Sequence, residues 1–461
     1  MRELSVLAAA AEAPGRDCIV IDGVALSYSE VADRVRAAIA ALRGGGIAGG
    51  ERVALTVQID LDSIVWLYAL FELGCPAVIL HPGLTERERG RVLEQARPAR
   101  LISERAPMGH DRADPAALEG VPPERTLAIV QTSGTRGASR GAVLSRRAFA
   151  ASAAAHGANL PWTEDDRWLL SIPPAHVGGL SILTRCLIAR RCVVLDPGRF
   201  DPATTIRRID KWNVTLLSVV PTMLQRLLDL RDPSWAPSPA LRAVLVGGAR
   251  FTAALREEAA RRRIPVLSTY GCTEACSQVT TQSVEQSGEP GSGRPLDGIE
   301  VRLESGEIQV RGDVLMDGYA HEDLSGEPWT SDAWLRTGDL GCFMPDGQLE
   351  VLGRVDDLII TGGENVSPAE VEEFLCAVPG VMAACVCGLP HGDWGEEGVA
   401  AHVVDLERFD RVALRAEVRD GLAPHKRPKR VCLRDSLPLN RSGKIDRPAI
   451  AVQSQGTLEP I

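Results

Sequence analysis

Short apolar runs alternate with longer helix-like stretches through more than half of this chain, from about residue 18 to residue 270. Alternation at this spacing predicts a doubly wound α/β sheet, because each helix must cover a face of the sheet. The predicted strands are 18–21, 53–57, 77–80, 127–130, 142–144, 168–172, 192–195, 215–220, 243–246 and 266–268. The predicted helices are 29–42, 62–73, 85–96, 145–155 and 180–189, the first with Ser29 as its N-cap.

The pattern changes near residue 293 to short strands and turns, which predict a β-rich subdomain. A final α+β unit follows, with predicted helices at 367–377 and 411–422 and strands at 383–387 and 430–433. We therefore expect an α/β fold with a large N-terminal domain of doubly wound sheets plus the β-rich subdomain, and a small α+β C-terminal domain. The predicted domains are 1–353 and 354–461, and we expect the tail after Ile450 to be disordered.

Composition narrows the class of protein. A chain of 461 residues is too long for one ordinary core, and its net charge of −10, with acids and bases interspersed, argues against binding to nucleic acid. No apolar run is long enough to span a membrane, and the N-terminus lacks a convincing signal-peptide core. The 11 cysteines show no zinc-site spacing, so we expect reduced thiols and a cytoplasmic protein.

A small, polar, glycine-rich loop at 131–141 separates two of the predicted strands. It offers many uncovered backbone N–H groups, several hydroxyls and two arginines, which suit a polyphosphate. A flexible surface turn is the alternative for this loop taken alone. Other strand-end loops, at 219–222, 247–249 and 270–274, would converge with it, because ligands of open α/β sheets lie at the carboxyl ends of the strands.

Six motifs in order resemble those of the adenylate-forming superfamily, which includes acyl- and aryl-CoA synthetases, and the resemblance covers nearly the whole chain. Such enzymes join a carboxylate to the α-phosphate of ATP and release pyrophosphate. The motifs are Thr132-Ser133-Gly134-Thr135, Pro174-Ala175-His176, Tyr270-Gly271-Cys272-Thr273-Glu274, Thr337-Gly338-Asp339, Gly353-Arg354-Val355-Asp356-Asp357 and Gly443-Lys444.

The resemblance implies that Thr132, Ser133, Gly134 and Thr135 hold the β- and γ-phosphates of ATP. The loop departs from the family pattern at three positions: Arg136 replaces the usual second threonine, Ser139 a proline and Arg140 a lysine. Arg140 keeps the positive charge that offsets repulsion between the reacting anions, so we predict a catalytic role for it.

By the same resemblance, Glu274 binds Mg²⁺; an acid at the N-terminus of a helix is the alternative explanation. Tyr270 and Gly248 are predicted to flank the adenine, and Asp339 and Arg354 to bind the ribose hydroxyls. Gly271 and Thr273 complete the predicted nucleotide-binding set.

The C-terminal residues carry the other implied roles. Lys444 is predicted to bridge the substrate carboxylate and the α-phosphate, and Asp356 to be the hinge about which the small domain rotates. Gly363 belongs to 361–368, which is predicted to line a tunnel for the pantetheine arm of CoA. The alternative for Lys444 is that it is an ordinary exposed lysine.

The acid substrate is indicated by 171–183, which contains no carboxylate to pair with the ammonium of an amino acid. The segment from His176 to Arg185 looks like that of o-succinylbenzoate–CoA ligases of menaquinone synthesis, whose substrate has two carboxylates. We predict that Arg185 pairs with the second carboxylate, although solvent or an ion pair is the alternative for its side chain. His176 would lie between the acid pocket and the CoA tunnel, and Gly247 would line the acid pocket.

We therefore predict an ATP-dependent acid–CoA ligase that uses Mg²⁺, with a small carboxylic acid, ATP and CoA as its partners and no nucleic acid. Three alternatives to an o-succinylbenzoate–CoA ligase stay open: another aryl- or acyl-CoA ligase, an adenylating enzyme that loads a carrier protein, and a nucleotide-binding relative without catalysis. A homodimer is also left open.

Overall fold

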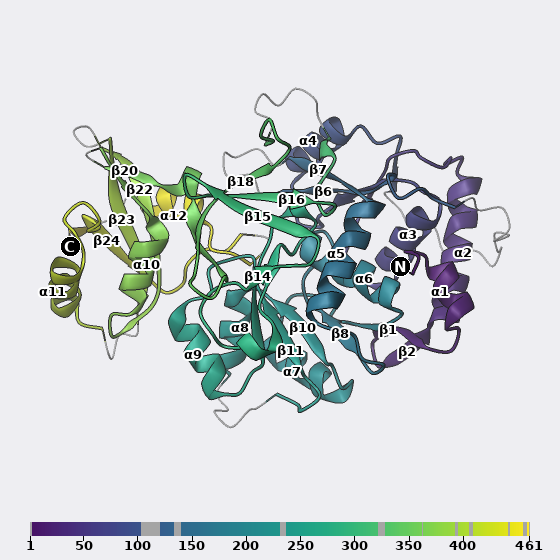
Figure 1. Cartoon of the computed structure of the whole chain (residues 1–461), viewed down its shortest axis with the longest axis horizontal. Coiled ribbons are helices and arrows are strands. Elements are labelled where there is room, and N and C mark those ends of the chain that lie inside the picture. The colour runs from purple at the N-terminus through teal and green to yellow at the C-terminus, as the bar shows by residue number, and fades with distance from the viewer. Residues whose placement is uncertain are drawn as a thin grey trace.

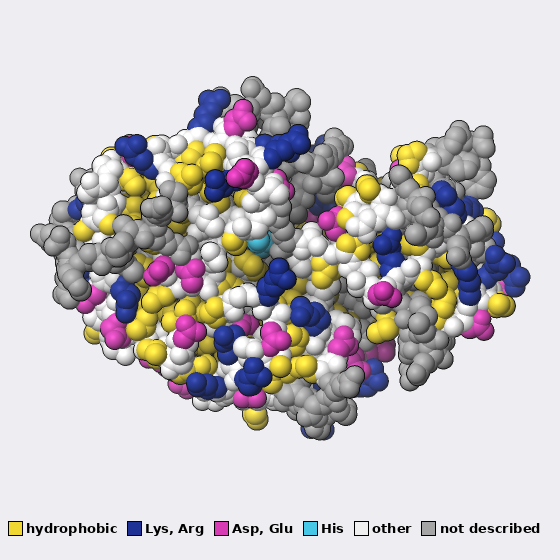
Figure 2. Space-filling model, turned by 180° about the vertical axis from the view of Figure 1, so that it is seen from behind, with side chains coloured by type: hydrophobic (Ala, Val, Ile, Leu, Met, Phe, Trp, Pro, Cys, Tyr) yellow, Lys and Arg dark blue, Asp and Glu magenta, His cyan; other side chains and the backbone are white. Residues whose placement is uncertain are grey.

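The computed structural model of the chain describes residues 2–102, 120–132, 140–230, 237–320, 328–361, 363–391, 395–404, 409–440, 443–454 and 459–460. A large N-terminal body carries a much smaller C-terminal one at one end of its long axis (Figure 1). This arrangement confirms the predicted fold class. Seen from the opposite side, a groove separates the two bodies, and basic and acidic side chains of the described residues are intermixed on this face (Figure 2).

The largest sheet has nine strands within the described residues. Its six central strands, from β12 to β1, are parallel, so their carboxyl ends meet at one edge of the sheet. In order across the sheet the strands are β14 (Arg294–Pro295), β13 (Thr280–Thr281), β12 (Val266–Tyr270), β11 (Ala243–Val246), β10 (Leu216–Val219), β8 (Arg167–Leu170), β9 (Cys192–Leu195), β1 (Asp17–Ile21) and β2 (Val24–Ser27).

A second sheet is built mainly from the preceding part of the chain. Its strands are β17 (Gly318–Tyr319), β7 (Gly141–Ser145), β6 (Thr126–Gln131), β4 (Ala77–Leu80), β3 (Val53–Thr56) and β5 (Arg100–Ile102). Strands β6, β4, β3 and β5 are parallel, whereas β7 returns antiparallel to β6. The glycine-rich loop therefore starts at the carboxyl end of a parallel strand and leads into an antiparallel one.

The helices of the large body cover these two sheets (Figure 1). Most residues of α3 and α6 are buried, because both helices belong to the main core of the body. The described helices are α1 (Val6–Glu12), α2 (Tyr28–Gly44), α3 (Leu61–Glu72), α4 (Glu86–Ala96), α5 (Arg146–Asn159), α6 (Val177–Ala189), α7 (Pro202–Lys211), α8 (Pro221–Leu228) and α9 (Ala253–Arg261).

Two of the predicted helix starts are wrong. Helix α2 is capped by Ser27 and not by Ser29, because the Ser27 hydroxyl accepts from the Glu30 N–H while the Glu30 carboxylate accepts from the Ser27 N–H. Helix α6 starts at Val177, three residues before the prediction, with His176 at its N-cap position. Gly178 and Gly179 suggested a loop, but they form the first turn of this helix.

The β-rich subdomain is a four-stranded antiparallel sheet within the described residues, made of β15 (Ile299–Glu304), β16 (Glu307–Gly312), β18 (Leu335–Phe343) and β19 (Leu349–Arg354). It lies between the two large sheets and the small body (Figure 1). Asp339, on strand β18, lies opposite Arg354 on β19.

The small body has a sheet of its own, with helices packed on it. Two clusters of buried apolar side chains, separate from the main core, hold it together. Its elements are β20 (Ile359–Thr361), β21 (Glu364–Val366), α10 (Pro368–Cys376), β22 (Val381–His391), β23 (Gly395–Val404), α11 (Arg411–Gly421), β24 (Arg430–Arg434), α12 (Arg447–Ser454) and β25 (Glu459–Pro460).

The C-terminal tail differs from the prediction, because α12 continues past Ile450 to Ser454 instead of ending in disorder. Ile450 is fully buried in the small body, and this contact gives the helix a reason to continue. An ion pair between Arg250 and Glu373 joins the two bodies. The domain boundary between residues 353 and 354 stays a prediction. Within the described residues, each helix is too short or too polar to cross a bilayer.

Candidate active site

Asp339 is a buried carboxylate that two side chains hold from two elements. The Tyr270 hydroxyl, at the end of β12, donates to Oδ2 over 2.7 Å, and Nη1 of Arg354, on β19, donates to Oδ1 over 2.8 Å. Burial raises the pKa of Asp339, against the opposing effects of Arg354 and of the hydrogen bond from Tyr270. The structure thus brings together three of the residues predicted to bind the nucleoside.

Lys444 reaches this cluster from the small body. Its side chain runs over the backbone of Gly248, where a Cβ atom would lie 3.2 Å from Cε of the lysine. Gly248 has a φ of +80°, which also favours glycine. Burial lowers the pKa of Lys444, and the nearby Asp339 carboxylate opposes this shift. The predicted catalytic lysine and the predicted nucleoside site are therefore adjacent.

Lys444 is held in place by a short turn and by a hydrogen bond from the large body to that turn. Within the turn, the Asn440 N–H donates to the Lys444 carbonyl over 2.7 Å, and the Lys444 N–H donates to Oδ1 of Asn440 over 3.1 Å. The hydroxyl of Thr222, in α8, donates to the Gly443 carbonyl over 2.6 Å. The lysine is thus presented by a preformed turn that touches the large body through Thr222.

Glu274 lies near the glycine-rich loop, in a short 3₁₀ turn, η2 (Thr273–Ala275). The Tyr319 hydroxyl donates to Oε1 of Glu274 over 2.9 Å. The guanidinium of Arg140 stacks on the Tyr319 ring, 4.1 Å from its centroid. Tyr319 thus links the predicted metal ligand to the predicted phosphate cation.

The two ends of the glycine-rich loop are tied together. The Thr132 N–H donates to the Arg140 carbonyl over 2.8 Å, and the Arg140 N–H donates to the Thr132 hydroxyl over 3.4 Å. The predicted phosphate ligands Ser133, Gly134 and Thr135 lie outside the described residues.

A magnesium ion fits the chemistry of this end of the site. Among the described residues, no group of three His, Cys, Asp or Glu side chains could hold a metal by itself. Mg²⁺ typically takes one or two protein carboxylates and completes its octahedron with phosphate oxygens and water. The Glu274 carboxylate, beside the end of the phosphate-type loop, suits that mode of binding.

His176 marks the start of the predicted acid pocket. Its ring lies against the ring of His81, which follows β4, with centroids 5.3 Å apart. A Cβ on Gly179 would lie 2.5 Å from the Pro173 carbonyl oxygen, so only glycine lets α6 come this close to the preceding loop. Local packing therefore fixes the position of His176 at the junction of the two sheets.

Gly247 follows β11 and faces the end of β12. A Cβ there would lie 2.7 Å from the methyl carbon of Thr269 and 2.8 Å from its carbonyl oxygen. The absence of a side chain at this position keeps the two strand ends close together. The predicted contact of Gly247 with the acid stays a prediction.

Arg185 is buried in the core of the large body, which excludes solvent as its partner. Its Nη1 donates to Oε1 of Gln278 over 2.5 Å, and Nη2 donates to the Ser152 hydroxyl over 2.8 Å. Oε1 of Gln278 also lies 3.1 Å from Nδ1 of His156, and Nε2 of Gln278 donates to the Thr269 hydroxyl over 3.3 Å. Burial lowers the pKa of Arg185 to about 10, so it is still a cation at neutral pH. Its hydrogen bonds go to neutral groups, which differs from the ion-pair alternative.

The positions of the remaining predicted residues are explained by local backbone structure and packing. At Gly271 a Cβ would collide with the carbonyl oxygen of Ser277, so packing alone demands glycine there. Thr273 is the first residue of η2. Gly363, with a φ of +84°, makes the turn between β20 and β21, and Asp356 is exposed in the short segment that joins the bodies.

Sequence reasoning missed several residues of the site. Tyr319 lies in a two-residue strand, and the one signal in the sequence was its rarity, since the chain has only 4 tyrosines. Gln278 and Thr222 are ordinary polar residues whose importance depends on their partners, Arg185 and Gly443. Sequence spacing could not have indicated either contact, because both join segments far apart in the chain.

The chain matches two family models, described as AMP-binding enzyme, over residues 6–320, and AMP-binding enzyme C-terminal domain, over residues 370–444. It is 33% identical to a 2-succinylbenzoate–CoA ligase of Bacillus licheniformis, over 94% of this chain and 96% of that one.

Among solved structures, it is similar to o-succinylbenzoate CoA synthetase from Bacillus subtilis in complex with the acyl-adenylate intermediate OSB-AMP. The TM-score is 0.87 at 30% identity, over 98% of both chains. The same enzyme in complex with ATP and magnesium ion also has a TM-score of 0.87 at 30% identity, over 97% of this chain and 99% of that one.

Proposed function

The chain belongs to the AMP-binding enzyme family, and from this premise we propose that it is an ATP-dependent 2-succinylbenzoate–CoA ligase that serves menaquinone synthesis. The observation that carries the proposal is the approach of Lys444, from the small body, to Asp339 and Gly248 in the large one. This geometry suits a carboxylate and an α-phosphate that must meet at one cation.

In the first half-reaction, a carboxylate oxygen of the acid attacks the α-phosphorus of ATP, and pyrophosphate leaves. Lys444 provides a compact ammonium that can contact an oxygen of each reactant and offset the repulsion between them. Asp339 is suited to accept hydrogen bonds from the ribose hydroxyls, with Arg354 holding the carboxylate in place. Arg140 adds positive charge near the β- and γ-phosphates.

Glu274 is the proposed magnesium ligand, and the ion would neutralise charge on the phosphate oxygens. The Tyr319 hydroxyl orients one carboxylate oxygen of Glu274 through their hydrogen bond, and the other oxygen would bind the ion. The same tyrosine ring carries Arg140 on its face, so the position of this cation is set together with that of the metal ligand.

In the second half-reaction, the CoA thiol attacks the acyl carbonyl and AMP leaves. Rotation of the small body about Asp356 would remove Lys444 from the site and bring Gly363 and its neighbours toward it. This movement would break the hydrogen bond from Thr222 to Gly443 and the packing of Lys444 over Gly248. His176 would then lie between the acid and the arriving thiol.

Arg185 and Gln278 support the choice of an acid with a second carboxylate. Arg185 places a cation behind Gln278, whose amide nitrogen donates to Thr269 beside Gly247. An amino-acid substrate would instead need a carboxylate partner for its ammonium, and residues 171–183 contain none.

The test is CoA-thioester formation from o-succinylbenzoate, benzoate and a medium-chain fatty acid, with ATP and Mg²⁺, for wild type and Lys444→Ala. The proposal expects a preference for o-succinylbenzoate that the variant loses. Turnover of only another acid would keep the chemistry and reject the substrate. Pyrophosphate release without transfer to free CoA would favour a carrier-protein acceptor, and ATP binding without pyrophosphate release would favour a relative without catalysis.

A further inference from the structure

Glu307 lies beside the stretch of backbone that carries Asp339. It is the first residue of β16, the neighbour of β18 in the β-rich sheet (Figure 1). Oε1 of Glu307 accepts a hydrogen bond of 3.1 Å from the N–H of Gly338, the residue that precedes Asp339. The Glu307 side chain is only 12% exposed, so water competes weakly for this contact. A carboxylate on one strand thus holds the backbone that presents the proposed ribose acceptor.

The pairing of β16 with β18 is irregular at this point. Glu307 pairs with Leu340. Two residues further along β16, Gln309 pairs with Arg336. One residue of β16 therefore lies opposite three residues of β18, 337–339, which form a bulge. A bulge redirects its side chains, so the conformation of this one decides where the ribose acceptor points.

Side chains meet the N–H groups of two bulge residues. Glu307 accepts from Gly338, and the Thr337 hydroxyl accepts from the Asp339 N–H over 3.1 Å. The Thr337 hydroxyl in turn donates to the Ile308 carbonyl over 2.7 Å. Gly338 has a φ of +71°. Glycine adopts positive and negative φ about equally readily, so Glu307 supplies a hold on the backbone that Gly338 itself lacks.

The carboxylate of Asp339 can accept from two more donors. Its Oδ1 accepts from Arg354 and its Oδ2 from Tyr270. Each carboxylate oxygen has two acceptor positions, so each can take one further hydrogen bond, which matches the two hydroxyls of a ribose. Both contacts need one direction of the carboxylate, and a hydrogen bond behind the site is the usual means of fixing such a direction.

The two oxygens of Glu307 have different partners. Oε1 faces Gly338, whereas Oε2 accepts from Nε of Arg336 over 3.0 Å. The Arg336 side chain is 57% exposed, and an ion pair at such a surface contributes little to stability. The contact with Gly338 needs an acceptor oxygen and does not need a negative charge.

We propose that Glu307 is a positioning residue for the nucleotide, because it holds the bulge 337–339 in the conformation in which Asp339 faces both ribose hydroxyls. This inference rests on the ribose role of Asp339 in the proposed function, but not on the identity of the acid. The alternative is that Glu307 only stabilises the sheet.

The test is calorimetric binding of ATP, 2′-deoxy-ATP and 3′-deoxy-ATP to the full chain, with Mg²⁺ and without acid, so that no turnover occurs. Wild type should bind each deoxy nucleotide about tenfold or more weakly than ATP, because each lacks one hydrogen bond to a charged group. Glu307→Ala should bind ATP about tenfold more weakly than wild type, and its preference for ATP over the deoxy nucleotides should shrink to about threefold or less.

Three further variants separate the acceptor oxygen from the charge. Glu307→Gln keeps an acceptor for the Gly338 N–H and loses the charge, so it should discriminate as wild type does. Glu307→Asp keeps the charge, but its shorter side chain withdraws the oxygen from Gly338. It should therefore lose discrimination, and it replaces Glu307→Ala if that variant does not fold. Arg336→Ala should discriminate as wild type does. The opposite order of Glu307→Gln and Glu307→Asp would overturn the proposal.

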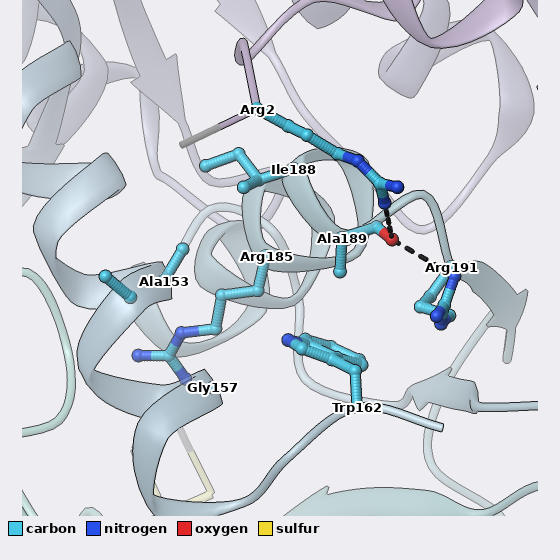
Figure 3. A pocket seen from close by; sticks show the side chains of 9 residues that line it. Arg2, Ala153, Gly157, Trp162, Arg185, Ile188, Ala189 and Arg191 are labelled. Atoms are coloured by element: carbon cyan, nitrogen blue, oxygen red, sulfur yellow. Dashed lines mark hydrogen bonds between the residues drawn. The ribbon is translucent and has the colours of Figure 1, made fainter. Parts of the chain in front are cut away.

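Arg191→Ala controls for a general loss of stability. Arg191 donates to the carbonyls of Thr163 and Ala189 at the end of α6 (Figure 3). It directly precedes β9, so it lies at the amino-terminal edge of the parallel strands, whereas Tyr270 ends β12 at their carboxyl edge. This variant should lower the melting temperature and keep the wild-type preference for ATP.

Two other outcomes would overturn the inference, and they differ in what they mean for the proposed function. If Glu307→Ala weakens binding of all three nucleotides by the same factor, Glu307 is structural only and the ribose role of Asp339 stands. If wild type binds ATP and the deoxy nucleotides equally, Asp339 does not bind the ribose, and the nucleoside part of the proposed function fails as well.

Discussion

The two cations that matter most in this chain, Lys444 and Arg185, have opposite surroundings. Lys444 is half-buried between two bodies, faces a carboxylate, and is held by a turn that touches the large body through Thr222. Arg185 is buried within one body, its hydrogen bonds go to neutral groups, and it is fixed by the packing of α6. A cation that must enter and leave a site is presented at an interface, whereas one that only has to provide a constant field can be built into the core.

The largest effect is expected from Lys444→Ala. Loss of a cation that acts on charge developing in the reaction should lower the rate of pyrophosphate release by about 10²–10³-fold. The melting temperature should stay close to that of wild type, because the lysine is at an interface. Lys211→Ala, which removes an exposed lysine stacked on Trp212, is the control and should retain full activity. Equal rates in the two variants would contradict the role of Lys444.

Arg185→Met should separate function from stability. We expect the KM for o-succinylbenzoate to rise by about tenfold or more, with little change for benzoate, because a buried charge near the second carboxylate is lost. Stability should be unchanged or higher, since Gln278 keeps its contact with His156 and Ser152 keeps its hydrogen bond to Cys276. Thermal unfolding and steady-state kinetics on both acids check this.

Arg146→Met is the matched control for that variant. Arg146 is also buried, but it donates to the carbonyls of Phe71 and Leu4 and lies near the buried Glu72. Removing it should destabilise the fold by about 3 kcal/mol without changing the preference between acids. If Arg185→Met also destabilised the fold without changing the preference between acids, the role of Arg185 would be structural only.

The pH dependence of pyrophosphate release tests the role of the Lys444 ammonium. Its pKa is lowered by burial, so the ammonium is lost as pH rises, at a lower pH than for an ordinary lysine at about 10.4. The kcat/KM for pyrophosphate release should therefore fall tenfold per pH unit on an alkaline limb that begins below that value. In Lys444→Arg the alkaline limb should move to higher pH. If the substitution leaves the limb unchanged, the limb belongs to another titratable group.

The smallest effect is expected at Thr222, which holds the turn of Lys444. Thr222→Val removes the 2.6 Å hydrogen bond to Gly443 and should cost about 1 kcal/mol, which is about fivefold in pyrophosphate release. Thioester formation from preformed acyl-adenylate should be unchanged, since Lys444 is then outside the site. Thr204→Val, on α7, is the control; a loss in both half-reactions would show general damage instead.

The parts of the fold that could be predicted are those with local signals. Strands β9 and β11 match the prediction at both ends, because each is an uninterrupted apolar run buried on both faces. Strand β23 was not predicted. It pairs with β22 along the whole length of β23, and this pairing could not be seen in the sequence. The start of α6 was misjudged because Gly179 has a packing role that only the backbone of Pro173, across the turn, reveals.

In the candidate site, too, some residues could be predicted and others depend on contacts that have no local signal in the sequence. The resemblance predicted Asp339 and Arg354 as a pair, and the register of β18 and β19 does place them opposite each other. Spacing alone could not have given that register, because an irregularity follows Leu340 and shifts the pairing. Tyr319 and Gln278 went unnoticed because a hydrogen-bonded link between two predicted residues has no local signature.

The scarcity of lysine gives the interface turn a practical use. The chain has only four lysines, and Lys211 is exposed on the large body whereas Lys444 is half-buried between the bodies. An amine-reactive reagent should therefore label Lys211 at a constant rate and Lys444 only when the small body has turned away. The ratio of the two labelled peptides in a mass spectrum would follow the rotation of the unmodified protein through each half-reaction.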